Sequence, residues 1–322
     1  MSFRRFLKIS KKLYQLAPWD YLGNNDYCQM FLKDEQPILV CTTGSAITQN
    51  FGFIICRNPL QADYFLTLKD EILESEISTY RRYQHYSLFY KRYQDLNEEE
   101  KKFFADKAQE EELYPVLKHI RWYSPDTNPS KSDLEALSEI LDNLYILINA
   151  VAFGKIKKTN QDFFEIPTRV YNPNTKKYDN FYFAFFEEMY RISPNSVLDQ
   201  EKIKKGFSNL VSNDLIVEYD LLYLPLKQDE DSLLALSVLW DVEGNKNLAV
   251  KLLAIKDDRE SVFMNFYLSC MLEFGIFKEV RCRDNIDRKL LLSLDIPNKP
   301  DYVIAKLENV DRVVEEVMAK YY

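Results

Sequence analysis

The chain has 322 residues, of which 46% are apolar and 29% are charged, with only 7 glycines and 12 prolines. This composition excludes a disordered or fibrous protein and suffices for two domains with apolar cores. The net charge of −8 falls almost wholly on residues 211–322, where 14 basic residues stand against 21 acidic ones, so this part lacks the basic surplus of a nucleic-acid-binding domain.

The sequence also indicates the cellular compartment of the protein. No apolar run reaches the roughly 18 residues of a membrane span, and Lys11 and Lys12 interrupt the start too early for a signal-peptide core. The five cysteines are odd in number and lack Cys-x-x-Cys spacing, which favours buried, reduced thiols. We therefore expect a cytoplasmic protein without a membrane partner.

The N-terminal part predicts an antiparallel sheet with helices. An amphipathic helix is expected at 2–16, with Phe6 and Leu13 on one face and a basic face that is solvated or touches a membrane or RNA. Asn58-Pro59 and Asn97 have the chemistry of helix starts, and Ser132 is the expected cap of a long helix that Gly154 ends. Strands are expected at 27–33, 37–43, 51–56, 84–90, 114–123, 163–171 and 178–186.

The C-terminal part predicts a mixed sheet. A polar stretch at 191–212 marks the boundary, which gives domains 1–195 and 210–322. Strands then alternate with helices, which requires crossover connections. The expected strands are 215–224, 233–241, 248–255, 278–283 and 302–307, and the expected helices are 260–274, 286–294 and 309–320. The fold class is therefore α+β: an antiparallel-sheet domain with helices, followed by a mixed-sheet α/β domain of βββ-α-β-α-β-α order.

That order is similar to the ribonuclease H-like superfamily, whose nucleases hold two metal ions with carboxylates on the first strand, on the first helix and at the end of the fourth strand. At those places this sequence has Glu218 and Asp220, which share parity and so one face, then Glu260 and Asp284. The resemblance implies a metal-dependent nuclease or a degenerate relative. Glu260 and Asp284 would be its metal ligands, and magnesium or manganese would be its cofactor.

Two other interpretations of these acids stay open. Glu260 and Asp284 are also the residues expected at helix N-termini and caps, in which case no cofactor is needed. Asp241, at the end of the expected strand 233–241, would replace Glu218 and Asp220 as the first-strand acid only if that strand is counted as the first.

A second resemblance covers the whole chain. It rests on Trp19-Asp20-Tyr21-Leu22, Asp26, the Gly44/Gly52 hairpin leading to GFIICRNP, and the later LYPVLKHIRWYSPDTNPSKSDLEAL. These features resemble an uncharacterised bacterial two-domain family related to proteins with SEC-C or plasmid ORF-3-like domains. The resemblance implies an architecture and no reaction.

Residues 41–56 (CTTGSAITQNFGFIIC) offer two further sites, a phosphate loop and a cysteine pair, that the spacing disfavours. The two glycines are eight positions apart without a following lysine, so they do not form a phosphate-binding loop. Cys41 and Cys56 lack the four close ligands of a zinc site, although a hairpin could set them across from each other as thiols or a disulfide.

The two histidines, His85 and His119, are expected to be structural or on the surface, since no nucleophile motif accompanies them.

Residues 81–92 interleave basic and aromatic side chains, a mixture that suits base stacking, a protein interface or an ordinary strand. With no catalytic signature elsewhere, the sequence predicts a non-catalytic protein-binding module with an unidentified protein partner. Nucleic acid is the less favoured partner, and a metal-dependent nuclease or degenerate nuclease-like protein is the alternative function.

Overall fold

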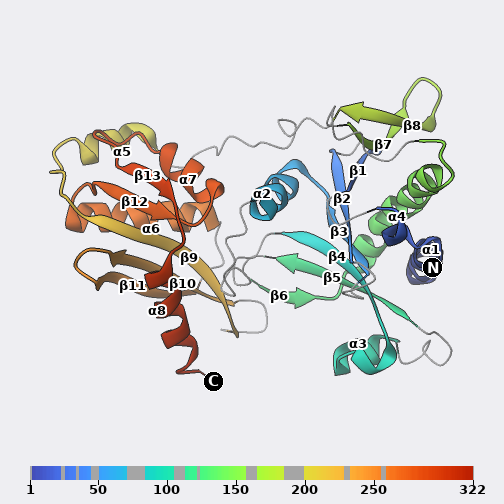
Figure 1. Cartoon of the computed structure of the whole chain (residues 1–322), viewed down its shortest axis with the longest axis horizontal. Helices are drawn as coiled ribbons and strands as arrows, with labels where there is room; N and C mark the ends of the chain where they lie inside the picture. The colour runs from blue at the N-terminus through green and yellow to red at the C-terminus, as the bar shows by residue number, and fades with distance from the viewer. Residues whose placement is uncertain are drawn as a thin grey trace. The chain divides into compact units, whose positions relative to one another are not determined.

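The structure is a computed structural model that describes residues 2–22, 26–33, 36–44, 51–70, 84–104, 113–121, 124–156, 165–184, 199–227, 233–254 and 259–321. Its helices and two sheets confirm the α+β class (Figure 1). Within these ranges, no helix has the length and apolar character needed to cross a bilayer.

The chain forms two compact units that are not simple halves of the sequence. Unit 1 comprises Met1–Asp63, Gln84–Ile120 and Asp126–Arg191, and unit 2 comprises Tyr64–Tyr83, Arg121–Pro125 and Ile192–Tyr322. The limits 1–195 and 210–322 stay a prediction, and unit 2 takes two additional segments from the earlier sequence.

An eight-stranded sheet dominates the first part of the chain. Its strand order is β6-β5-β4-β3-β2-β1-β7-β8. The strands are β1 (Tyr27–Phe31), β2 (Ile38–Thr43), β3 (Gly52–Cys56), β4 (His85–Lys91), β5 (Tyr114–Arg121), β6 (Ser124–Thr127), β7 (Glu165–Asn172) and β8 (Lys177–Ala184). The helices are α1 (Ser2–Leu16), α2 (Pro59–Asp70), α3 (Glu98–Phe104) and α4 (Lys131–Ala152).

One pairing in this sheet departs from the expected antiparallel pattern. Strand β1 pairs with β7 in parallel, with Gln29 opposite Thr168 and Phe31 opposite Val170. The local pattern of β1 specifies a strand but not its second neighbour, which arrives only after α4. In the same sheet, the pairs β1–β2, β2–β3, β3–β4, β4–β5 and β7–β8 are antiparallel as predicted.

Helices α1 and α4 bury apolar side chains, including the Phe6 and Leu13 face predicted for α1. Phe6 and Leu13 of α1 join Leu141 and Leu144 of α4 in one core with β1 to β4. The basic face of α1 is partly used within the unit, because Arg5 forms an ion pair with Asp142 at 2.6 Å.

Helix α4 begins differently from the prediction, because Ser130 rather than Ser132 is its cap. The Ser130 hydroxyl accepts from the Asp133 backbone N–H, and the Asp133 carboxylate accepts from the Ser130 backbone N–H. This reciprocal pair is a capping box.

A five-stranded sheet forms the centre of unit 2, with strand order β11-β10-β9-β12-β13. Its strands are β9 (Ile216–Lys227), β10 (Leu233–Asp241), β11 (Lys246–Ala254), β12 (Glu279–Cys282) and β13 (Asp301–Ile304). The helices are α5 (Gln200–Phe207), which the sequence analysis missed, α6 (Arg259–Phe274), α7 (Asn285–Leu292) and α8 (Glu308–Met318). Strand β9 is antiparallel to β10 and parallel to β12, so the sheet is mixed as predicted.

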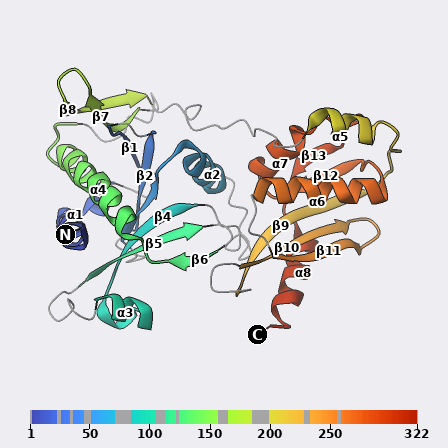
Figure 2. The ribbon, with the colours of Figure 1, turned by 180° about the vertical axis from the view of Figure 1, so that it is seen from behind.

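Two helices cover opposite faces of this sheet (Figure 2). Tyr219 of β9 packs its ring on Phe263 of α6 and donates a hydrogen bond to the Phe263 carbonyl. Leu222 points to the other face because side chains alternate along a strand, and there it meets Val310 of α8 in a buried cluster. The even-numbered residues of β9 therefore lie under α8.

Candidate functional site

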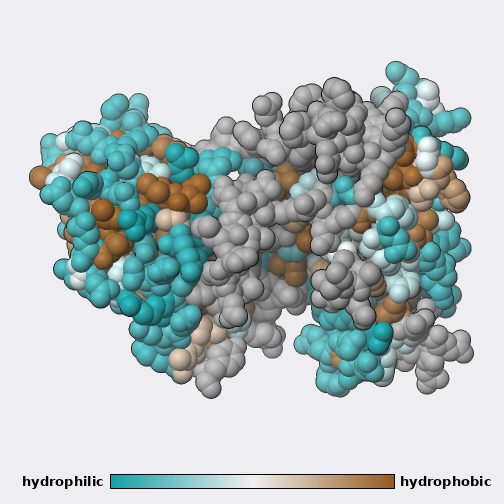
Figure 3. Space-filling view, in the orientation of Figure 1, coloured by the Kyte–Doolittle hydropathy of each residue, from teal (hydrophilic) through white to brown (hydrophobic). Residues whose placement is uncertain are grey.

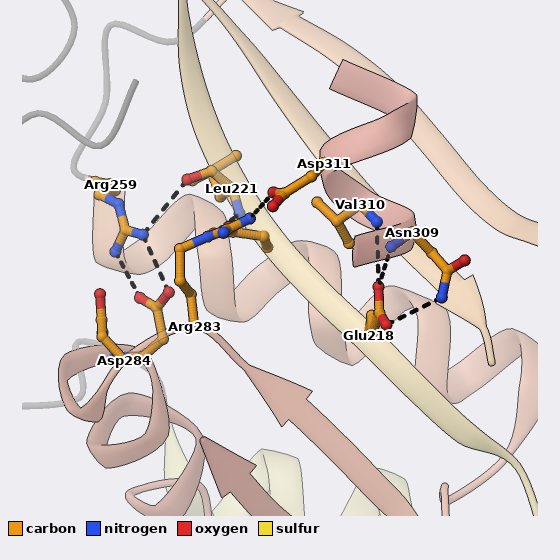
Figure 4. A network of polar contacts seen from close by, with 10 residues as sticks. Glu218, Leu221, Arg259, Arg283, Asp284, Asn309, Val310 and Asp311 are labelled. Atoms are coloured by element: carbon orange, nitrogen blue, oxygen red, sulfur yellow. Dashed lines mark hydrogen bonds and ion pairs between the residues drawn. The ribbon is translucent and has the colours of Figure 1, made fainter. Parts of the chain in front are cut away.

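The four carboxylates that the sequence selected lie in unit 2, and each has a partner within the protein. Figure 4 shows the polar contacts around Glu218, Arg283 and Asp284. Glu218 accepts from the backbone N–H groups of Asn309 and Val310, at 2.9 and 3.1 Å, and from the Asn309 side chain. Leu307, the residue that precedes α8, has no side chain that can cap it. A buried strand residue therefore caps α8 from a distance.

Asp220 is paired with an arginine. The Nε of Arg283 donates to Asp220 at 2.7 Å, and Nη2 of Arg283 donates to Asp311 of α8. Burial alone would lower the pKa of the Arg283 guanidinium, but the two carboxylates hold that pKa above its ordinary value. A fixed cation thus lies between an acid of the first strand and an acid of the last helix.

Glu260 and Asp284 belong to other contacts. Glu260 accepts from the Tyr64 hydroxyl at 2.8 Å, and burial raises the pKa of Tyr64. Asp284 caps α7 by accepting from the Asp287 backbone N–H at 3.0 Å.

A second buried ion pair lies next to these contacts. Arg259 of α6 donates to Asp287 at 2.9 Å, and its other terminal nitrogen lies 3.4 Å from the Leu221 carbonyl. Both ion-pair residues are almost fully buried, so the pair joins α6, α7 and β9 in the interior of the unit.

The arrangement brings Glu218 and Asp220 to one face of the sheet, as their parity indicates, but gives each a different internal partner. Among the residues that the structure describes, no three His, Cys, Asp or Glu side chains are grouped to hold a metal ion. This donor set does not fit a two-metal centre as it stands, since such a centre needs carboxylates that bridge ions about 4 Å apart. The catalytic role of the four acids, and the metal-ligand role of Glu260 and Asp284, stay predictions. Asp241, the alternative acid, accepts from the Gly244 N–H in the turn after β10.

The cysteines of residues 41–56 lie on neighbouring strands but not directly opposite. Cys41 pairs with Ile54, and Cys56 pairs with Leu39, so the two thiols are offset by two positions. All five cysteines are buried thiols outside any disulfide. Burial raises the pKa of Cys28 to about 12 and that of Cys56 still further, so these thiols are poor nucleophiles.

The glycines of the same stretch serve the backbone. Gly44 has φ 104°, a left-handed conformation that suits glycine. A Cβ on Gly52 would lie 2.3 Å from the Leu88 carbonyl oxygen, so glycine permits the close approach of β3 to β4. Residues 45–50, between the two glycines, lie outside the described ranges.

One cluster in unit 1 escaped the sequence analysis. Tyr86 donates to Asp133 at 2.7 Å, the His119 ring stacks on Tyr86 at 4.2 Å, and Arg57 lies 3.8 Å from Asp133. Burial alone would raise the pKa of Asp133, but hydrogen bonds from Ser130 and Tyr86 bring that pKa below its ordinary value. Because Asp133 already belongs to the capping box of α4, this cluster has a structural role. Part of the basic–aromatic stretch, residues 81–83, lies outside the described ranges.

Apolar side chains at the surface are the second feature that the sequence did not reveal (Figure 3). On strand β11, Val250 and Leu252 are 42% and 40% exposed. They lie at the edge of the five-stranded sheet.

A scan against protein-family models and a search among curated proteins found no match to this chain.

Proposed function

We propose that this chain is a non-catalytic protein-binding module. The observation that carries the proposal is the position of Arg283, whose guanidinium lies between Asp220 and Asp311 in the interior of unit 2. A divalent ion at these two carboxylates would have to displace that cation. Breaking a buried ion pair by removing one partner costs about 3–5 kcal/mol, so the arrangement favours the arginine over a metal.

The remaining acids support the same conclusion. Glu218 and Asp284 cap helices, and Glu260 accepts from a buried tyrosine. In these roles the carboxylates stabilise the fold, whereas a nuclease needs them directed at metal ions and phosphate. A protein partner would then bind the exposed part of the five-stranded sheet.

A degenerate or working metal-dependent nuclease of ribonuclease H-like fold is the second candidate. The element order from β9 to α8, which is βββ-α-β-α-β-α, favours it. Asp220 also lies beside the end of β12, where Asp284 follows.

A manganese titration followed by melting temperature separates the two candidates. We expect the wild-type chain, Asp220→Asn and Asp295→Asn to show no metal-dependent rise at millimolar manganese. Asp295 is an exposed acid and serves as the control for charge. A ligand present at a hundred times its Kd adds about 2.7 kcal/mol of stability, so a bound ion would raise the melting temperature visibly. A rise that Asp220→Asn abolishes and Asp295→Asn retains would establish the metal site instead.

Capture from an extract of the native host, with the full chain as bait, tests the binding function itself. We expect a stoichiometric protein partner. The absence of any such partner under native conditions would count against the proposal.

A further inference from the structure

Strand β11 has an edge that can accept another strand. In the described part of the chain it pairs with β10 alone, over eight residue pairs from Leu234–Ala254 to Asp241–Lys246. An edge strand presents unpaired N–H and C=O groups, which a partner segment can bind by adding a strand to the sheet. With nine residues, β11 is long enough for such pairing.

The two faces of β11 differ in chemistry. On the α8 face, Val250 lies opposite Val238 and Leu252 opposite Leu236. Val238 and Leu236 belong to the buried cluster under α8, so the apolar interior continues outward to the two exposed residues of the edge.

The opposite face of β11 is basic. Lys251 lies opposite Ser237, and Lys246 lies opposite Asp241. The register between β10 and β11 shifts by one residue at Leu239/Trp240, so Lys246 shares the face of Lys251 although its number is even. Both lysines are exposed. Among the described residues, no ion pair joins either lysine to an acid. These two positive charges stand out in a region of the sequence whose net charge is −7.

We propose that β11 binds an extended segment of a partner protein in which apolar side chains alternate with acidic ones. This inference rests on the proposed binding function. The alternation follows from the edge itself, because successive side chains of an added strand face opposite sides of the sheet. Apolar residues of the partner would extend the layer of Val250 and Leu252, and its acids would lie beside Lys246 and Lys251.

A second copy of this chain fits the edge less well. Antiparallel pairing of two β11 strands about Val250 sets Lys251 of each copy diagonal to Lys251 of the other, and pairing about Lys251 sets them directly opposite. Like charges opposite each other destabilise a sheet, and lysines on an edge oppose association of identical strands. Charge complementarity therefore selects an acidic partner.

A peptide-binding experiment with the full chain tests the proposal. The probe is a labelled peptide as long as β11, nine residues, of alternating valine and glutamate. Its controls are a peptide of the same composition with the valines and glutamates in separate blocks, and an alternating valine–lysine peptide. Fluorescence anisotropy gives the affinity. We expect only the alternating acidic peptide to bind, with an affinity that falls as salt rises.

Variants of the chain assign the binding to the edge. Lys251→Glu should weaken binding about tenfold, because it replaces an attractive cross-strand pair with a repulsive one. Val250→Glu should weaken it on the apolar face. Lys278→Glu makes the same charge change at an exposed position before β12 and should bind as wild type does. Circular dichroism melts confirm that each variant is folded.

Three outcomes would overturn the proposal. The alternating acidic peptide fails to bind, or Lys251→Glu and Lys278→Glu bind it equally well. In the third outcome, sedimentation shows a dimer of the chain that Val250→Glu dissociates, so that the edge belongs to a second copy. If the native partner is captured equally by wild type, Val250→Glu and Lys251→Glu, the binding function stands and only the β11 surface is refuted.

Discussion

Replacing Arg283 by methionine tests whether the buried charges of unit 2 hold the fold together. Methionine keeps much of the side-chain volume and removes the guanidinium. The change leaves Asp220 fully buried, with a hydrogen bond from the Leu221 backbone N–H but without the Arg283 cation, and it removes the same cation from Asp311.

Arg283→Met should lower the free energy of unfolding by about 3–5 kcal/mol, which is the cost of breaking a buried ion pair by removing one partner. We expect the upper part of this range, because one substitution removes the cation from two carboxylates. Since a whole domain is stable by about 5–15 kcal/mol, such a loss is a large fraction of the total.

Arg281→Met is the matched control. Arg281 stands two residues earlier, on β12 itself, and its pair with Glu279 is partly exposed at both ends. Exposed ion pairs contribute about 0–1 kcal/mol, so the same chemical change should cost little there.

Urea unfolding followed by tryptophan fluorescence measures both variants. The chain has three tryptophans, and Trp240 lies in the cluster under α8. A background with Trp19→Phe and Trp122→Phe therefore reports on unit 2 alone. If Arg283→Met costs no more than Arg281→Met, the network does not stabilise the fold, and the argument that the arginine takes the place of a metal loses its basis.

Two further predictions concern a helix cap and the buried thiols. Glu218→Ala should lower the free energy of unfolding by about 2–3 kcal/mol, because α8 loses its cap and three hydrogen bonds. Glu218→Gln keeps one acceptor oxygen, so it should lower the free energy of unfolding by less. Equal and small losses for the two variants in urea unfolding would refute the capping role. Burial raises the pKa of Cys28 and Cys270 from the ordinary 9.0 to about 12, so both should resist iodoacetamide in the native chain at pH 8. The stability from these raised pKa values is present below pH 9 and is lost as the pH rises toward 12. Rapid alkylation of Cys28 or Cys270 in the folded protein would contradict the predicted resistance. A free energy of unfolding that stays constant from pH 9 to pH 12 would contradict the raised pKa values.

Local patterns in the sequence predicted most elements because their signals are short-range. The apolar period of Phe6 and Leu13 placed α1 at its observed bounds. The cap of α4 was placed at Ser132, although Ser130 and Asp133 have the three-residue spacing of a capping box, so this signal was readable. Helix α5 was missed because it is short and polar, and its signal is the Asp199 cap.

The candidate site depended on information that no local pattern contains. The parity of Glu218 and Asp220 correctly indicated a shared face. Their partners come from residues far along the chain: Asn309 for Glu218, and Arg283 for Asp220. Whether a buried acid meets a metal or an arginine is decided by such long-range contacts. The same holds for Tyr64, whose contact with Glu260 spans 196 positions.

The parallel pairing of β1 with β7 bears on how the protein is made. Gln29 and Thr168 are about 140 residues apart. During synthesis on the ribosome, one edge of β1 therefore stays unpaired until β7 has been made, when most of unit 1 is already synthesised. Strands β9, β10 and β11 are instead joined by consecutive antiparallel pairings and can form soon after they emerge. Contacts between distant residues slow folding, and uncovered strand edges favour aggregation. The N-terminal sheet therefore keeps one strand edge unpaired for longer during synthesis than β9, β10 and β11 do.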